Sequence, residues 1–154
     1  MNFNISNYDI HLHIQPKKIL ENFTQCKSTD PEAGGIILGK IIDNQINILK
    51  LSIPTSLDRS SRRNFERNKL GAQIILDYEF HNSNGQLVYL GEWHTHPESN
   101  PTPSKTDLQM LRRQFKDNSL NTDFLILLIK GIKSLYIGII NDDGYVEASN
   151  IKII

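Results

Sequence analysis

Apolar residues fall in short runs along this chain, and their spacing predicts strands with a few helices between them. The run over 124–129 is apolar without interruption, which predicts a central strand buried on both faces. Asp43-Asn44 separates two isoleucine-rich runs and predicts a hairpin turn. The expected strands cover residues 10–14, 32–42, 45–53, 87–93, 123–130, 133–140 and 145–153.

Three stretches have the apolar spacing of a helix. The first is expected to begin at Pro16, which suits the first turn of a helix, and the second closes at Asn84-Gly85. Ser104 suits the N-cap of the third. The apolar positions are Ile19, Leu20, Phe23 and Cys26 as a buried stripe of the first helix, Ile74, Ile75 and Tyr78 within 70–80, and Leu108, Leu111 and Phe115 in the third.

The segment 56–67 is polar and strongly basic. Its arginines are Arg59, Arg62, Arg63 and Arg67. Such a run can hold a carboxylate-bearing partner, but the solvated face of a helix is the more common explanation. We therefore expect a solvated helix face here, with binding of an acidic partner as the alternative.

Strands with interspersed helices and a closing run of strands predict an α/β fold, in which a mixed sheet is sandwiched by helices. The 154 residues suit one domain, 1–154. Lys plus Arg and Asp plus Glu both number 17, so no global charge favours nucleic acid or an anionic membrane. The N-terminus lacks a basic, apolar leader, and no stretch approaches the roughly 20 apolar residues of a membrane span. Cys26 is the only cysteine, which excludes an internal disulfide and suits a reducing cytoplasm.

The chemistry of the chain is concentrated between Glu92 and Asp107. His94 and His96 are two residues apart on an expected strand, so their side chains share a face. A loop with three prolines then leads to Ser104 and Asp107, which are neighbours on a helix surface. Two imidazoles and a carboxylate suit Zn²⁺, and three protein ligands leave the fourth tetrahedral position for water. The pattern predicts one catalytic zinc ion per chain, held by His94, His96 and Asp107.

Each part of this pattern has an ordinary explanation when it is taken alone. Histidines are common on exposed strands, and Ser-x-x-Asp at a helix start is close to a capping box. His11 and His13 show the same i, i+2 spacing, but no carboxylate follows them at a comparable interval. The conjunction of two histidines, a serine and an aspartate therefore favours the metal site. Ser104 can cap the helix and still hydrogen-bond the oxyanion of a tetrahedral intermediate.

A hydrolytic site also needs a carboxylate that takes a proton from water and passes it to the leaving amine. Asp107 is used as a ligand, so another acid must serve. Glu92 lies two residues before His94 and should share its face of the strand. The spacing alone leaves Glu92 and Glu32 as alternatives for this base.

The spacing His-x-His-x7-Ser-x2-Asp at His94, His96, Ser104 and Asp107 resembles the signature of the JAB1/MPN/Mov34 (JAMM) metalloproteases. The segment Glu32-Ala-Gly-Gly-Ile-Ile-Leu-Gly39 resembles the glycine-rich strand with the family's catalytic glutamate. The resemblance implies that Glu32 is the general base, that Glu92 is a contact to the substrate or to a ligand, and that the fold is related to cytidine deaminase. Deaminase chemistry itself needs a Pro-Cys-x-x-Cys segment, which one cysteine cannot supply.

Within this family, Gly91-Glu-Trp-His-Thr-His-Pro97 and the preceding segment 58–67 are most similar to a prokaryotic branch that includes the deconjugating isopeptidase of CBASS antiphage operons. This resemblance implies a deubiquitinase-like zinc isopeptidase that acts on a protein with an extended C-terminal tail, such as a conjugated cGAS-like nucleotidyltransferase, beside an E1/E2-like ligase. Two alternatives remain open. One is processing of the tail of a ubiquitin-like or sulfur-carrier protein, and the other is a non-catalytic MPN scaffold.

Overall fold

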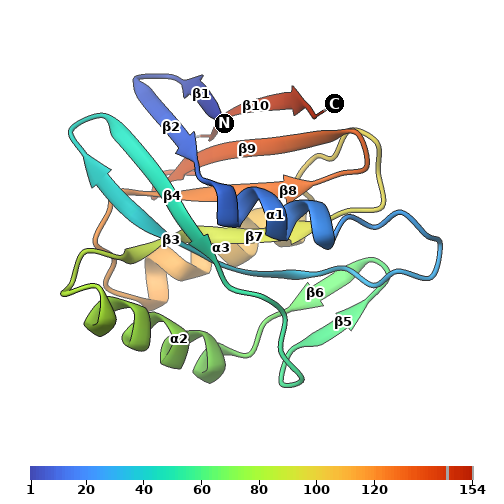
Figure 1. The fold of residues 1–154 in the computed structure, drawn as a ribbon, viewed down its shortest axis with the longest axis horizontal. Helices are drawn as coiled ribbons and strands as arrows, with labels where there is room; N and C mark the ends of the chain where they lie inside the picture. The colour runs from blue at the N-terminus through green and yellow to red at the C-terminus, as the bar shows by residue number, and fades with distance from the viewer. Residues whose placement is uncertain (145, 154) are drawn as a thin grey trace.

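The protein is built on an eight-stranded mixed sheet, and a separate two-stranded hairpin stands beside it (Figure 1). The computed structural model describes residues 1–144 and 146–153. The elements in chain order are β1 (Asn2–Ile5), β2 (Tyr8–Leu12), α1 (Ile14–Asn22), β3 (Gly34–Ile42), β4 (Gln45–Leu51), β5 (Arg59–Ser61), β6 (Asn64–Glu66), α2 (Lys69–Asn82), β7 (Val88–Thr95), α3 (Lys105–Asp117), β8 (Phe124–Lys130), β9 (Ser134–Asn141) and β10 (Val146–Lys152).

The order of strands in the large sheet is β1-β2-β4-β3-β7-β8-β9-β10, with β7 and β8 near its centre. The pairs β2/β4 and β7/β8 are parallel, and the other pairs are antiparallel. Two parallel neighbours need a crossover connection, and α3 lies in the one between β7 and β8. This connection places the start of α3 beside the end of β7, which is where the functional residues meet.

Helices cover both faces of the sheet, so the predicted α/β sandwich is confirmed. Leu20 of α1 packs with Ile126 and Leu128 on one face, and Leu111 of α3 packs with Leu125 and Leu127 on the other. Figure 1 shows α1 in front of the sheet and α3 behind it. Strand β8 is therefore buried on both faces, as its apolar run predicts. None of the described helices is long and apolar enough to cross a membrane.

The N-terminal region differs from the expected strand and helix. Strand β2 ends at Leu12, and Ile14 is 71% exposed as the first residue of α1. The helix ends at Asn22, so helical spacing no longer decides the orientation of the residues beyond it. Cys26 is exposed, and the neighbouring Gln25 is buried in its place. The prediction that Cys26 belongs to a buried stripe is therefore wrong.

The basic segment 56–67 is a hairpin and not the face of a helix. Arg59 of β5 pairs with Glu66 of β6, Ser60 pairs with Phe65, and Arg62 and Arg63 form the tip. Strands of three residues are too short to show the two-residue period of a strand. A polar, basic segment without that period is more common on the solvated face of a helix, so the sequence does not predict the hairpin. The segment that follows, α2, is helical as predicted, but none of its residues is buried. The last predicted strand is observed as β10, and residue 145 of that prediction lies outside the described residues.

Gly91 creates a bulge in the middle of β7. Its φ is +152°, and a Cβ at this position would lie 1.9 Å from the carbonyl oxygen of Ile126. Gly91 pairs with Ile37, while Tyr89 pairs with Leu38, so Leu90 is the extra residue. As a result Tyr89 and Glu92, three residues apart, lie on the same side of the strand and form a hydrogen bond.

Candidate metal centre

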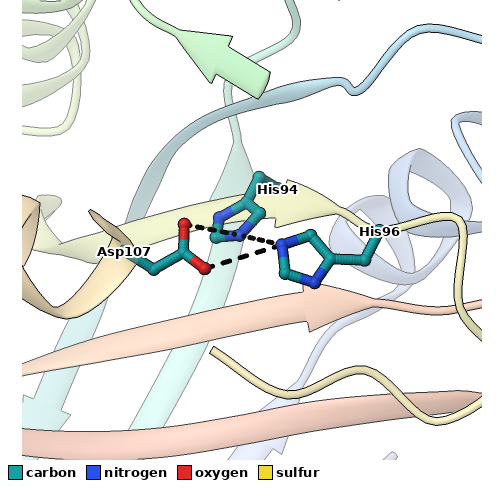
Figure 2. A group of neighbouring side chains, drawn as sticks. All are labelled: His94, His96 and Asp107. Carbon is teal, nitrogen blue, oxygen red and sulfur yellow. Dashed lines mark hydrogen bonds and ion pairs between the residues drawn. The ribbon is translucent and has the colours of Figure 1, made fainter. Parts of the chain in front are cut away.

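His94, His96 and Asp107 converge at the point where β7 ends and α3 begins. The Nε2 atoms of the two histidines are 3.0 Å apart. Asp107 Oδ1 lies 3.3 Å from His94 Nε2, and Oδ2 lies 3.5 Å from His96 Nε2. Figure 2 shows the three side chains pointing toward one another: His94 comes from β7, His96 from the residue just after it, and Asp107 from α3. Among the described residues this is the one cluster of such side chains that could hold a metal ion.

These separations fit a tetrahedral metal site. Metal–ligand bonds of about 2.0–2.1 Å place neighbouring ligand atoms about 3.3 Å apart. The two histidines are 4% and 8% exposed, and Nδ1 of His96 is buried without a hydrogen-bond partner among the described residues. Because both rings direct Nε2 to the same point as a carboxylate, these three residues could hold a metal ion, and two imidazoles with one carboxylate fit the ligands that zinc accepts.

The electrostatics of the cluster keep Asp107 ionised, as a metal ligand must be. Burial alone would raise the pKa of Asp107, but hydrogen bonds from His94 and His96 hold it well below its usual range. Burial likewise opposes a charge on His96, but the hydrogen bond and charge of Asp107 outweigh it and raise the pKa of the imidazole. Without a metal, the carboxylate thus attracts protons to the ring. A bound cation would compensate the same negative charge.

Ser104 is the N-cap of α3, as its sequence context predicts. Its Oγ accepts a hydrogen bond from the backbone N–H of Asp107 at 3.1 Å, and its own N–H donates to Asp107 Oδ2 at 2.7 Å. This capping box fixes the orientation of the Asp107 carboxylate. The hydroxyl hydrogen of Ser104 is not used by the cap, so it can be donated into the adjoining cleft.

Glu32 lies in the same cleft as the three candidate ligands, although it is about 60 residues upstream in the chain. Its side chain is in the segment just before β3 and is 6% exposed. Burial raises the pKa of this carboxyl to about 7; the charge of His96 opposes the rise, and Asp107 and Glu98 add to it. The carboxyl group therefore changes its protonation state near neutral pH in the metal-free protein.

Glu92 also borders the cleft, but its carboxylate is bound to another side chain. Arg67, just after β6, places its Nε 2.8 and 2.9 Å from the two oxygens of Glu92. The hydroxyl of Tyr89 donates to Glu92 at 2.7 Å. Burial raises the pKa of Tyr89 well above its usual value, so this donor keeps its proton. The sequence gives no sign of this pairing, because Arg67 falls in a run of four similar arginines.

The cleft has a volume of about 950 Å³ and lies between the β5–β6 hairpin and α3. Phe65 of the hairpin packs on Gly34 at the start of β3, where a Cβ would lie 2.5 Å from the ring. The glycine thus lets the hairpin lie close to the strand. The polar and charged lining includes Glu32, Arg62, Arg63, Arg67, Glu92, Glu98, Ser104 and Arg113.

Four other residues are outside the centre, as expected. Trp93 and Thr95 are buried and point away from the candidate ligands into the protein, where Trp93 donates to the carbonyl of Ser52. His11 in β2 and His13 at the start of α1 each contact an asparagine side chain, and β2 is separated from β7 by β4 and β3 in the sheet. Neither belongs to a metal-binding cluster in the described part of the chain.

Comparison with known families identifies the family of the chain. Residues 23–141 match the model of the prokaryotic homologues of the JAB domain. The chain belongs to this family. The matched range contains Glu32, both histidines and Asp107. The predicted membership in the prokaryotic JAB branch is therefore confirmed.

Three curated relatives of this prokaryotic JAB protein are each called a CD-NTase/cGAS isopeptidase. The one from Escherichia coli is 34% identical over 87% of this chain and 85% of its own length. The relatives from Pseudomonas aeruginosa and Vibrio cholerae are 34% and 33% identical over 83% and 77% of this chain, and over 82% and 74% of their own lengths.

The JAB fold is also supported by a solved structure. The solution structure of a protein from Desulfitobacterium hafniense superposes with a TM-score of 0.59 and covers 94% of this chain and 91% of its own. The two sequences are 19% identical, so this likeness concerns the fold alone.

Proposed function

We propose that this protein is a zinc-dependent isopeptidase that hydrolyses the bond after the C-terminus of a conjugated protein. The observation that carries the proposal is the meeting of three candidate ligands with a buried, otherwise unused carboxylate, Glu32, in one open cleft. Zinc bound here would lower the pKa of a coordinated water to about 7 and polarise the scissile carbonyl. A non-catalytic scaffold would not need this full set of groups.

Glu32 is the general base of the proposed reaction. It takes a proton from the attacking water and delivers it to the nitrogen of the leaving lysine side chain. A base works best when its pKa is close to the operating pH, and burial already moves Glu32 to about 7 before a metal is bound. Glu92 does not compete for this role, because Arg67 and Tyr89 occupy its oxygens.

Ser104 is proposed to donate its hydroxyl hydrogen to the oxyanion that develops on the scissile carbonyl. It stands one turn before Asp107 and lines the cleft. Loss of one oxyanion donor costs about 3 kcal/mol of transition-state stabilisation in comparable hydrolases. The capping role of the same oxygen holds the donor in place.

The substrate is proposed to enter as an extended C-terminal tail that lies along a strand edge at the cleft. The proposed bearer of this tail is a conjugated cGAS-like nucleotidyltransferase, and the name CD-NTase/cGAS isopeptidase that the three relatives share supports this choice. The reaction would release it, in a cytoplasmic antiphage (CBASS) system in which an E1/E2-like ligase makes the conjugate. The exposed single thiol of Cys26 is compatible with a reducing compartment.

The proposal is tested with a nucleotidyltransferase conjugate prepared with an E1/E2-like ligase. We expect the zinc-loaded protein to release the free nucleotidyltransferase, and the His94→Ala variant to leave the conjugate intact. A fusion of the same tail to a linear peptide tests the alternative of tail processing. If the protein cleaves the linear fusion but not the conjugate, tail processing replaces isopeptidase activity as the proposed function.

A further inference from the structure

Gln25 is a buried side chain that connects three segments around the cleft. It is 2% exposed, although it lies in a loop. Its Nε2 donates to the carbonyls of Asp30 and Arg62, both at 3.0 Å. Its Oε1 accepts from the hydroxyl of Thr95 at 2.9 Å. Two carbonyls and a hydroxyl fix the orientation of the amide, and both of its N–H groups are used.

Thr95 continues this connection to the residue after Glu32. Its Oγ accepts a hydrogen bond from the backbone N–H of Ala33 at 3.0 Å, and its own N–H donates to the Ala33 carbonyl at 2.9 Å. Thr95 is fully buried and stands between the candidate ligands His94 and His96. The strand that carries the ligands is thereby bonded to the segment that carries Glu32.

The backbone of Glu32 is held from the other side by the hairpin. Its N–H donates to the carbonyl of Ser61 at 2.7 Å, and its carbonyl accepts from the hydroxyl of Ser60. The Glu32 carboxylate, by contrast, receives no hydrogen bond from residues 1–144 or 146–153. The direction of this carboxylate is therefore set by its backbone and not by a partner of its own.

We propose that Gln25 and Thr95 are positioning residues for Glu32. They bind the segment 30–33 to β7 on one side and to the hairpin tip at Arg62 on the other. This inference rests on the proposed role of Glu32 as the base. Since a displacement of about 1 Å in a reacting group can cost about 100-fold in rate, loosening this segment should slow the chemical step while zinc is still bound.

Two variants remove the connection at different points. Gln25→Met deletes all three hydrogen bonds of the amide, and Thr95→Val deletes the hydroxyl without a change of shape. Thr95→Ser keeps the hydroxyl and serves as the conservative control. Gln15→Met is the matched glutamine control, because Gln15 also makes two hydrogen bonds to a backbone, at Leu51, but away from the cleft.

The test measures kcat and KM for conjugate cleavage, zinc content, and amide hydrogen exchange at Glu32 and Ala33. We expect Gln25→Met and Thr95→Val to bind one zinc, to lose at least tenfold in kcat with KM within about threefold of wild type, and to show faster exchange at Ala33. Thr95→Ser and Gln15→Met should retain wild-type kcat. In a Glu32→Gln background, Gln25→Met should cause no further loss.

Several outcomes would overturn the inference. If exchange at Ala33 becomes faster but kcat stays at the wild-type level, the hydrogen bonds do not position the base. If Gln25→Met lowers kcat equally in the wild-type and Glu32→Gln backgrounds, its hydrogen bonds do not act through Glu32. If Gln25→Met does not fold, the same criteria apply to Thr95→Val. An inactive wild-type protein would contradict the proposed function itself and this inference with it, whereas an active wild type with fully active variants contradicts the positioning alone.

Discussion

Arg67 binds Glu92 through a buried, two-pronged ion pair. Nε of Arg67 lies 2.8 Å from Oε1, and Nη2 lies 2.7 Å from the same oxygen. The Arg67 side chain is 17% exposed and that of Glu92 is 4% exposed. The pair joins the end of the hairpin to β7, just before the candidate ligands. Glu92 is thus held in an ion pair, whereas Glu32 is a buried carboxylate of the cleft that receives no hydrogen bond from the described residues.

This relationship predicts which glutamate is essential for cleavage. Glu32→Gln should lower the single-turnover rate about 10²–10⁴-fold, because it removes the proton acceptor, while zinc content stays at one per chain. Glu92→Gln should keep most of the rate and lose mainly stability. The comparison requires the cleavage rates and zinc contents of both variants. An active Glu32→Gln beside an inert Glu92→Gln would reverse the assignment.

Breaking the Arg67–Glu92 pair should destabilise the fold. Arg67→Met leaves the Glu92 carboxylate buried without its partner, which should cost about 3–5 kcal/mol in the free energy of unfolding. The double variant Arg67→Met/Glu92→Met should recover most of this loss. Lys50 and Glu79 form an ion pair at 2.8 Å in which Lys50 is 43% exposed, so Lys50→Met is a control that should cost about 1 kcal/mol or less. Urea unfolding of the four proteins decides the matter; equal losses for Arg67→Met and Lys50→Met are incompatible with the buried pair.

Two roles of Ser104 can be separated by substitution. Ser104→Ala removes both the helix cap and the hydroxyl donor, so it should cost about 1 kcal/mol of stability and about 10²–10³-fold in kcat. Ser104→Asp keeps a good N-cap but has no hydrogen to donate when it is ionised, so it should restore stability but not the rate. Thermal unfolding and kcat of both variants test this. Full activity of Ser104→Ala would contradict the proposed hydrogen bond from Ser104 to the oxyanion, and helix capping would be its one supported role.

The stability of the metal-free protein should depend on pH through Glu32. Burial raises the pKa of this carboxyl from 4.5 to about 7 in the folded state. The folded state therefore favours the protonated form of Glu32. Its contribution to the free energy of unfolding is fully present below pH 4.5 and is lost as pH rises to about 7. At pH 8, ionised Glu32 should lower the free energy of unfolding of the metal-free protein by up to about 3 kcal/mol.

Glu32→Gln lacks this ionisation and provides the comparison. Urea unfolding of the two metal-free proteins should give similar stabilities at pH 4.5 and a more stable variant at pH 8. A wild type that gains stability over the variant between these two pH values would show that Glu32 is stabilised as a carboxylate in the absence of metal.

The features that follow from local rules could be predicted from the sequence. A strand places His94 and His96 on one face, and a helix cap places Asp107 beside Ser104, so the three candidate ligands could be named from their spacing. The continuous apolar run of β8 likewise predicts burial on both faces. In each case the deciding sequence pattern lies within one element or one short connection.

The features that depend on distant partners could not be predicted in this way. The hydrogen bond between Gln25 and Thr95 spans 70 residues, and the Arg67–Glu92 pair spans 25. The hairpin strands are too short for a periodic signal, and Cys26 lies beyond the end of α1 at Asn22, where helical spacing no longer applies. Family resemblance alone distinguishes Glu32, since no spacing rule relates it to residues about 60 positions away.

The central claim is that one zinc ion, held by His94, His96 and Asp107, is required for cleavage of the conjugate. Titration of zinc into the metal-free protein, with the rate of conjugate cleavage recorded at each step, tests it most directly. The rate should start near zero, rise in proportion to added zinc and reach its plateau at one zinc per chain. Full cleavage by the metal-free protein, or a plateau reached only at two zinc ions per chain, would contradict the claim.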